Sequence, residues 1–210
     1  MFLPLRIGTR GSPLALAQAQ ELRDRLAAAW PELAPPDAVE IVVIRTTGDK
    51  VTDRPLADIG GKGLFTKEID EAQLAGTITL AAHSAKDLPT WLPEGLEIAC
   101  YLPREDVRDA LIARTAGGID ALPAGAVVGT GSLRRQAQLL ARRPDLKAVP
   151  IRGNVATRLA KVAGGTVDAT FLALAGLKRL GNAHVATGVL EPDEMLPAAG
   201  QGAIAVTART

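Results

Sequence analysis

Short runs of β-branched and apolar residues alternate with segments of helical periodicity along nearly the whole chain. We predict helices that open at Ser12-Pro13 and span 132–143 and 154–163, because Ser is a preferred helix N-cap and Pro suits the first helical position. Strands alternating with helices predict an α/β fold with mainly parallel sheets. The predicted strands are 5–8, 39–45, 78–82, 96–101, 110–113, 126–129, 147–151, 168–173 and 203–207.

The chain has two candidate crossings between domains. The first lies at 101–104, and the second at 190–197, which contains two prolines and three acidic residues. The strand predicted at 203–207 would return to the first domain. We therefore predict domain one at 1–102 plus 200–210 and domain two at 103–199, with a cleft between them.

Composition excludes several classes of function. The net charge is +1 and aromatic residues make up 3% of the chain, which argues against nucleic-acid binding and against attraction to anionic membranes. No apolar run is long enough to span a membrane. One cysteine and two histidines provide too few ligands for a His/Cys metal site, so we predict no metal. The single cysteine also fits a reducing compartment, and we predict a cytoplasmic location.

Basic residues gather where predicted strands give way to helices. In open α/β sheets ligands bind beyond the carboxyl ends of the strands, so these junctions lie where a ligand would bind. Arginine forks and free helix-terminal N–H groups would both point at an anion with several carboxylates or phosphates. The residues concerned are Arg10, Lys62, Lys86, Arg134, Arg135, Arg152 and Arg158.

Arg134 and Arg135 occupy an unfavourable place, since the helix macrodipole disfavours cations in the first turn. For any one arginine, an ordinary solvated or salt-bridged role is the better interpretation. For the set, we favour an anion site. The turn Gly129-Thr130-Gly131-Ser132 lacks the Gly-Lys-Ser/Thr ending of a Walker loop and the third glycine of a dinucleotide fingerprint.

Asp87 follows Lys86 in a predicted loop, and the residues alone leave two roles open for it. One is an N-cap or salt bridge, and the other is exchange of pyrrole or amine protons with stabilisation of a cationic intermediate. His83 is expected to be structural, and Phe65 belongs either to the core or to a lid. Cys100, on a predicted strand with Leu96 and Ile98, is expected to be a buried structural thiol.

The order and spacing of these motifs closely resemble the porphobilinogen deaminase family over nearly the whole chain. The resemblance implies two periplasmic-binding-protein-like domains. It also implies the condensation of four porphobilinogen molecules to hydroxymethylbilane with loss of ammonia, starting from a dipyrromethane cofactor. The matching segments are 6–15, 47–49, 60–65, 83–89, 104–106, 129–136, 142–146, 151–155, 174–181 and 197–203.

The resemblance also implies roles for individual residues. Asp87 would be the catalytic carboxylate, and Lys62 and Phe65 would lie on a mobile loop. The cofactor would be held by Ser84, Lys86, Thr130, Ser132, Arg134, Arg135 and Arg158. The substrate would be received by Arg10, Ser12, Gln18, Arg152, Arg158 and Gln201.

The resemblance further implies a third domain whose cysteine bonds to the cofactor, whereas this sequence ends at Thr210. We therefore expect the chain to hold the cofactor non-covalently, to show weak or no repeated turnover, and to need a separate third domain. We also expect a monomer. The alternative hypothesis is a non-catalytic module that binds a linear tetrapyrrole or another polycarboxylate.

Overall fold

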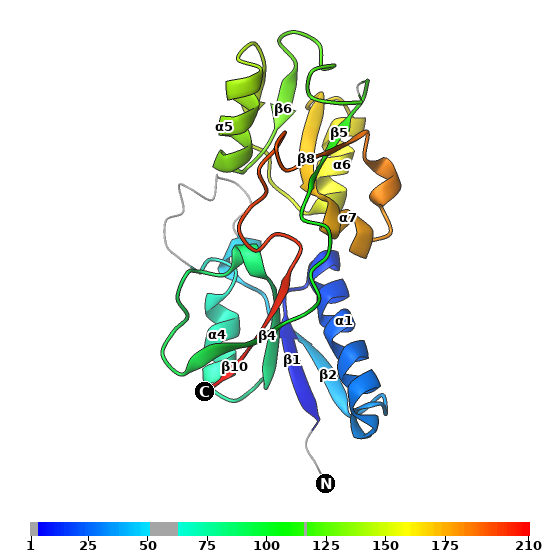
Figure 1. Ribbon diagram of the computed structural model, residues 1–210. Helices are drawn as coiled ribbons and strands as arrows, with labels where there is room; N and C mark the ends of the chain where they lie inside the picture. Colours follow the sequence, from blue (N-terminus) through cyan, green and yellow to red (C-terminus); the bar gives the residue numbers. More distant parts are fainter. Residues whose placement is uncertain (1–3, 51–62, 116) are drawn as a thin grey trace. The chain divides into compact units, whose positions relative to one another are not determined.

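The computed structural model describes residues 4–50, 63–115 and 117–210 (Figure 1). It divides into two compact units, Met1–Arg104 with Ala203–Thr210 and Glu105–Gly202. Each unit is built around one five-stranded sheet with helices packed against it, so the predicted α/β architecture is confirmed. In the described part of the chain, no helix combines the length and the apolar character needed to cross a bilayer.

The sheet of the first unit has the strand order β2-β1-β3-β10-β4. Strand β1 pairs in parallel with β2 and β3, whereas β10 is antiparallel to both β3 and β4. The last strand of the chain thus lies between β3 and β4. The strands are β1 (Leu5–Thr9), β2 (Val39–Val43), β3 (Leu80–Ser84), β4 (Leu96–Tyr101) and β10 (Ile204–Arg209).

The longest helix of the first unit, α1 (Pro13–Ala29), begins as its sequence predicts. The Ser12 hydroxyl accepts a hydrogen bond from the Ala15 N–H at 3.3 Å, and Pro13 occupies the first turn. Ala19 and Leu22 of this helix pack with Ile7 of β1 in the core. The other helical segments of the first unit are η1 (Pro31–Leu33), α2 (Thr47–Lys50), α4 (Lys67–Leu74) and η2 (Ala85–Asp87).

The sheet of the second unit has the order β7-β6-β8-β5-β9. Strand β6 is parallel to β7 and β8, and β5 is antiparallel to β8 and β9. The elements are β5 (Asp109–Ala113), β6 (Val127–Gly129), α5 (Leu133–Arg142), β7 (Lys147–Val149), α6 (Val155–Ala163), β8 (Ala169–Ala173), α7 (Leu174–Arg179), η3 (Ala183–Val185) and β9 (Gly188–Leu190).

Strand β5 is buried on both faces, as expected for a sheet covered by helices on both sides. Leu111 packs in one hydrophobic cluster with Leu139 of α5, while its neighbour Ile112 packs in another with Val162 of α6. Successive side chains of a strand point to opposite faces, so β5 contributes to both clusters.

The expectation of a buried Cys100 is wrong, because the cysteine is exposed. Strand β4 lies at the edge of its sheet, where one side has no neighbouring strand among the described residues. Only Leu96 of this strand is buried. The alternation of apolar and polar residues that suggested a half-buried strand therefore does not extend to its carboxyl end.

Candidate functional site

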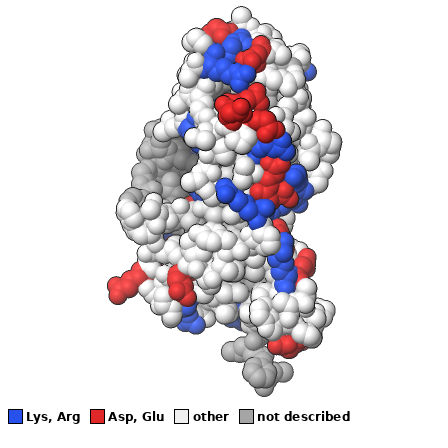
Figure 2. Space-filling model, in the orientation of Figure 1, with Lys and Arg blue, Asp and Glu red and all other residues white. Residues whose placement is uncertain are grey.

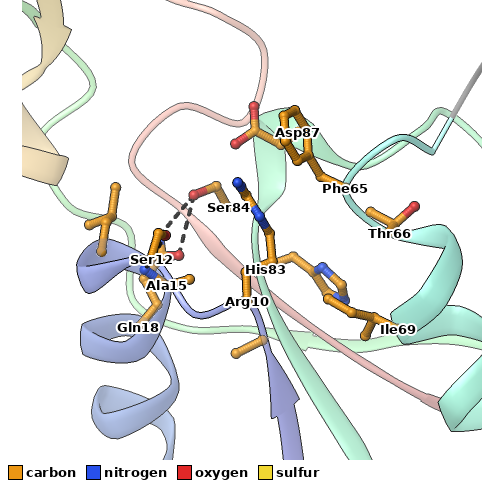
Figure 3. Close-up of a pocket in the computed structure, with 12 residues that line it drawn as sticks. Arg10, Ser12, Ala15, Gln18, Phe65, Thr66, Ile69, His83, Ser84 and Asp87 are labelled. Atoms are coloured by element: carbon orange, nitrogen blue, oxygen red, sulfur yellow. Dashed lines mark hydrogen bonds between the residues drawn. The ribbon is translucent and has the colours of Figure 1, made fainter. Parts of the chain in front are cut away.

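A pocket of the first unit lies where β1 and β3 end and α1 begins (Figure 3). It brings together residues that are far apart in the sequence, and six of them were predicted as site residues: Arg10, Ser12, Gln18, Phe65, Ser84 and Asp87. The remaining lining residues are Leu14, Ala15, Thr66, Ile69, Ala82 and His83. The predicted Lys62 lies outside the described residues.

Arg10 is the arginine among the described residues that line this pocket. Its Nε atom donates to Oδ1 and Oδ2 of Asp49, each at 3.2 Å, and its Nη2 atom also donates to Asp49. The guanidinium carbon lies 4.0 Å from the centroid of the Phe65 ring, which is within the range of a cation–π interaction. These contacts hold the planar guanidinium of Arg10 in one orientation.

Asp49 is fixed in turn by a hydrogen bond from Thr46 Oγ1 at 2.8 Å. Burial by itself raises the pKa of Asp49, but the hydrogen bonds from Arg10 and Thr46 more than offset it, so the pKa lies below its usual value. Arg10 is therefore already paired with an ionised carboxylate of the chain itself.

Gln18 of α1 and Ser84 at the end of β3 are joined across the pocket (Figure 3). The Gln18 amide donates a hydrogen bond to Ser84 Oγ at 2.9 Å, and Gln18 is only 4% exposed. A buried amide of this kind keeps the serine hydroxyl in place. Gln18 and Ser84, both predicted to bind ligands, are thus hydrogen-bonded to each other in the pocket wall.

Asp87 ends η2, the short helical turn that follows β3, and is exposed. It lines the pocket described above and also a second cavity, whose wall includes Pro89 and Trp91. A carboxylate that borders two adjoining cavities can contact a group lodged in either. Lys86, which precedes it, lies half-buried in the same turn.

His83 lines the pocket but is unsuited to proton exchange near neutral pH. It lies on β3, is buried, and its Nε2 is 3.4 Å from Thr207 Oγ1. Burial lowers the pKa of His83 to about 4. The ring is therefore neutral in the folded chain, in keeping with the structural role expected for it.

In the second unit, Arg134 and Arg135 converge on Asp109, the first residue of β5. Arg135 donates from Nη2 to Asp109 Oδ1 at 2.7 Å and from Nε to Oδ2 at 3.2 Å, and Arg134 donates from Nη2 to Oδ2 at 2.8 Å. Gln201 donates to Asp109 Oδ1 at 2.8 Å and to the Val107 carbonyl at 2.7 Å. The predicted residue Gln201 is fully buried, and its role toward the substrate stays a prediction.

The remaining predicted residues of the second unit lie at the starts of α5 and α6. Ser132 caps α5 by accepting from the Arg135 N–H at 3.4 Å, and its own N–H donates to Thr130 Oγ1 at 3.1 Å. Arg158 donates from Nε to the Gly153 carbonyl at 3.0 Å, and the Arg152 carbonyl accepts from Lys161. These contacts fix the two turns at the helix starts.

Many other charges on the second unit form ion pairs with each other, as Figure 2 shows for one face, where basic and acidic side chains adjoin. Arg142 pairs with Asp120 at 2.6 Å, and Arg108 pairs with Glu191 at 2.6 Å. The ordinary salt-bridged interpretation is right for arginines such as these. Arg10 and Arg134 also pair with carboxylates, but these two arginines themselves lie at strand-to-helix junctions, after β1 and after β6.

The sequence analysis missed Asp49 and Asp109 as residues that organise the arginines. Asp49 stood in a recognised segment, Thr47-Gly48-Asp49, without a role. Asp109 opens the apolar run Asp-Ala-Leu-Ile-Ala, and a charged residue at the start of a fully buried strand is the signal that could have identified it.

Comparison with known proteins shows which family the chain is similar to. A family model described as porphobilinogen deaminase, dipyromethane cofactor binding domain, matches residues 5–210. Over 206 residues the chain is 65% identical to the chloroplastic porphobilinogen deaminase of Oryza sativa and 65% identical to the porphobilinogen deaminase of Paracoccus denitrificans. Both matches cover 98% of this chain, but only 58% and 65% of those relatives. The chain thus spans about three fifths of their length.

Solved structures show what the fold is similar to. A periplasmic substrate-binding protein of an ABC transporter from Coxiella burnetii matches with a TM-score of 0.56 at 14% identity, covering 98% of this chain and 84% of that one. A putative methionine-binding lipoprotein from Bacillus subtilis matches with a TM-score of 0.52 at 12% identity, covering 99% and 84%. The predicted periplasmic-binding-protein-like fold is confirmed.

Proposed function

Because the chain belongs to the porphobilinogen deaminase family, and its matched region is the family's dipyrromethane cofactor-binding domain, we propose that it takes part in hydroxymethylbilane synthesis. In this reaction four porphobilinogen molecules join head to tail. At each step the aminomethyl C–N bond of one porphobilinogen breaks and releases ammonia, a new C–C bond forms, and the attacked pyrrole carbon loses its proton.

The observation that carries this proposal is that Asp87 lines the same pocket as an arginine and a serine that could bind carboxylates. Asp87, Arg10 and Ser84 line one pocket, so a pyrrole whose acetate or propionate reaches Arg10 would lie near the Asp87 carboxylate. We propose that this carboxylate stabilises the cation left when ammonia departs and accepts the proton lost on coupling. A positioned acid–base group contributes roughly 10²- to 10⁴-fold to a rate.

The residues of the second unit would hold further carboxylates. Dipyrromethane supplies the pyrrole on which the chain of rings grows, and each added ring brings two more carboxylates. Arg134 keeps part of its side chain exposed beside Asp109, Arg152 precedes α6, and Arg158 lies in the first turn of that helix. Their chemistry fits acetate and propionate groups because arginine can form paired hydrogen bonds with a carboxylate.

The test measures turnover and binding on the same protein. The chain is incubated with preassembled dipyrromethane and porphobilinogen, and hydroxymethylbilane is assayed by its closure to uroporphyrin. Asp87→Asn should abolish measurable turnover while dipyrromethane binding persists. Glu97→Gln, which changes an exposed carboxylate on β4, is the control and should retain turnover.

Two results would contradict the proposal. If the unaltered chain binds dipyrromethane but forms no hydroxymethylbilane, it is a binding module and not an enzyme. If Asp87→Asn keeps full turnover, Asp87 is not the catalytic carboxylate.

We further propose that porphobilinogen is the small-molecule substrate, that a separate third domain is needed besides the cofactor, and that the chain is a cytoplasmic monomer. The single cysteine supports the location, because free thiols are typical of a reducing compartment. The rice relative is named as chloroplastic, so cell fractionation is the measurement that decides the compartment. Sedimentation analysis would test the monomer.

A further inference from the structure

Among the described carboxylates of the second unit that pair with an arginine, Asp109 is the most deeply buried. Its residue has no exposed surface, and its two oxygens together accept four hydrogen bonds, from Arg134, Arg135 (two) and Gln201. Burial by itself raises the pKa of Asp109, but the hydrogen bonds and charges of Arg135, followed by those of Arg134, outweigh it. The pKa therefore lies below the usual value, and Asp109 is a carboxylate anion.

This anion explains how two arginines can occupy the first turn of α5. The macrodipole disfavours cations there, and two adjacent positive charges also repel each other. Asp109 lies against both guanidinium groups, at 2.8 Å from Arg134 and 2.7 Å from Arg135. It offsets one of the two positive charges, so the cluster keeps a net charge of about one for a ligand.

The two arginines are held differently. The Nε and Nη2 atoms of Arg135 donate to Asp109, its Nη1 donates to the Phe171 carbonyl at 3.0 Å, and its side chain is 6% exposed. Arg134 is 23% exposed, and its contacts are to Asp109 and the Leu196 carbonyl. Of the two arginines, Arg134 is therefore the one whose side chain is accessible to a ligand. Asp109 and Arg135 are buried next to it.

We propose that Asp109 is a positioning residue, which holds Arg134 against the buried Arg135 in the orientation that receives a carboxylate of dipyrromethane. This inference rests on the proposed function for the identity of the ligand, but the geometry it describes belongs to the chain itself. Gln201 supports the arrangement by donating to Asp109 from the opposite end of the unit's sequence.

The test uses Asp109→Asn, which keeps the shape of the side chain and removes its charge, and Asp109→Glu, which keeps the charge. The control is Asp168→Asn in the same unit. Asp168 accepts from the Val127 N–H at 2.8 Å and pairs with Arg114, so this change weakens the sheet without touching Arg134. Circular dichroism identifies a temperature at which all variants are folded.

Two readouts are made at that temperature. The first is the order and hydrogen exchange of the Arg134 and Arg135 Nε–H groups by NMR, without ligand. The second is the dissociation constant for dipyrromethane by calorimetry. In Asp109→Asn both Nε–H groups should lose order, and the dissociation constant should rise roughly 10- to 100-fold, the usual weight of a charge-assisted contact. Asp109→Glu should recover part of the affinity, and Asp168→Asn should bind like the unaltered chain.

The outcomes separate this inference from the proposed function. Unchanged arginine order and affinity in folded Asp109→Asn, or an equal loss of affinity in Asp168→Asn, would overturn the positioning role. If the unaltered chain fails to bind dipyrromethane while the arginine order still depends on Asp109, the proposed function fails and the positioning of Arg134 stands.

Discussion

Arg10 forms an ion pair with both carboxylate oxygens of Asp49 just after β1, and the same guanidinium lies over the Phe65 ring. The side chains of the pair are 27% and 29% exposed, so solvent and small ligands can reach them. A substrate carboxylate that binds Arg10 must share or replace the contacts of Asp49. The geometry favours a planar carboxylate and depends on the fork of the arginine.

Replacing Arg10 by Lys should therefore weaken porphobilinogen binding roughly 10- to 100-fold, since Lys keeps the charge but loses the paired hydrogen bonds. The dissociation constant measured by calorimetry with porphobilinogen checks this. Arg6→Lys is the matched control, because Arg6 lies on β1, directly before the Arg10 segment, and pairs with Glu40 at the surface. Equal weakening in both variants would count against a specific role for Arg10.

Ser84→Ala should destabilise the first unit by about 1–3 kcal/mol, because the buried Gln18 amide then loses its partner. The free energy of unfolding in urea measures the effect. Gln18→Leu with Ser84→Ala should be less destabilising than the sum of the single changes, because no polar group is left unpaired. Gln20→Leu, on the exposed side of α1, is the control for the helix. Strict additivity would show that the two residues do not interact.

The stability of the first unit should contain two opposing pH dependences. His83 has a folded pKa of about 4 against 6.5 in the unfolded chain, so only the unfolded chain binds its proton between these values. The free energy of unfolding then falls as the pH drops from about 6.5 to about 4. Asp70 has a folded pKa raised by burial to about 6 from 3.8, so its contribution falls as the pH rises from 3.8 to about 6. Each effect amounts to roughly 3 kcal/mol, and over the shared range they largely cancel.

Replacing one residue at a time should reveal the pH dependence that the other one contributes to stability. His83→Gln should become more stable on acidification from pH 6 to pH 4.5, and Asp70→Asn should become less stable over the same range. Urea unfolding at fixed pH values gives both profiles, and the double variant should be nearly flat. Identical slopes in the two single variants would refute the assignment.

Much of the architecture could be predicted because its signals are local. Ser12-Pro13 and Ser132 mark the starts of α1 and α5, where the structure places them. The apolar runs predicted as strands also form strands, apart from a few residues at their ends. The position of Cys100 could not be read in this way, because its exposure depends on β4 lying at the edge of the sheet.

The sequence alone determined the α/β alternation, the helix starts and the gathering of arginines at strand-to-helix junctions. Only the tertiary structure decided which carboxylates those arginines meet. Asp49 lies 39 residues from Arg10, and Asp109 lies 25 residues from Arg134. Capping and periodicity act within a turn or two of chain, whereas these ion pairs depend on strand order and on the packing of helices against the sheets. The physical reason is that a side chain finds its charged partner across the fold, after the strands have paired.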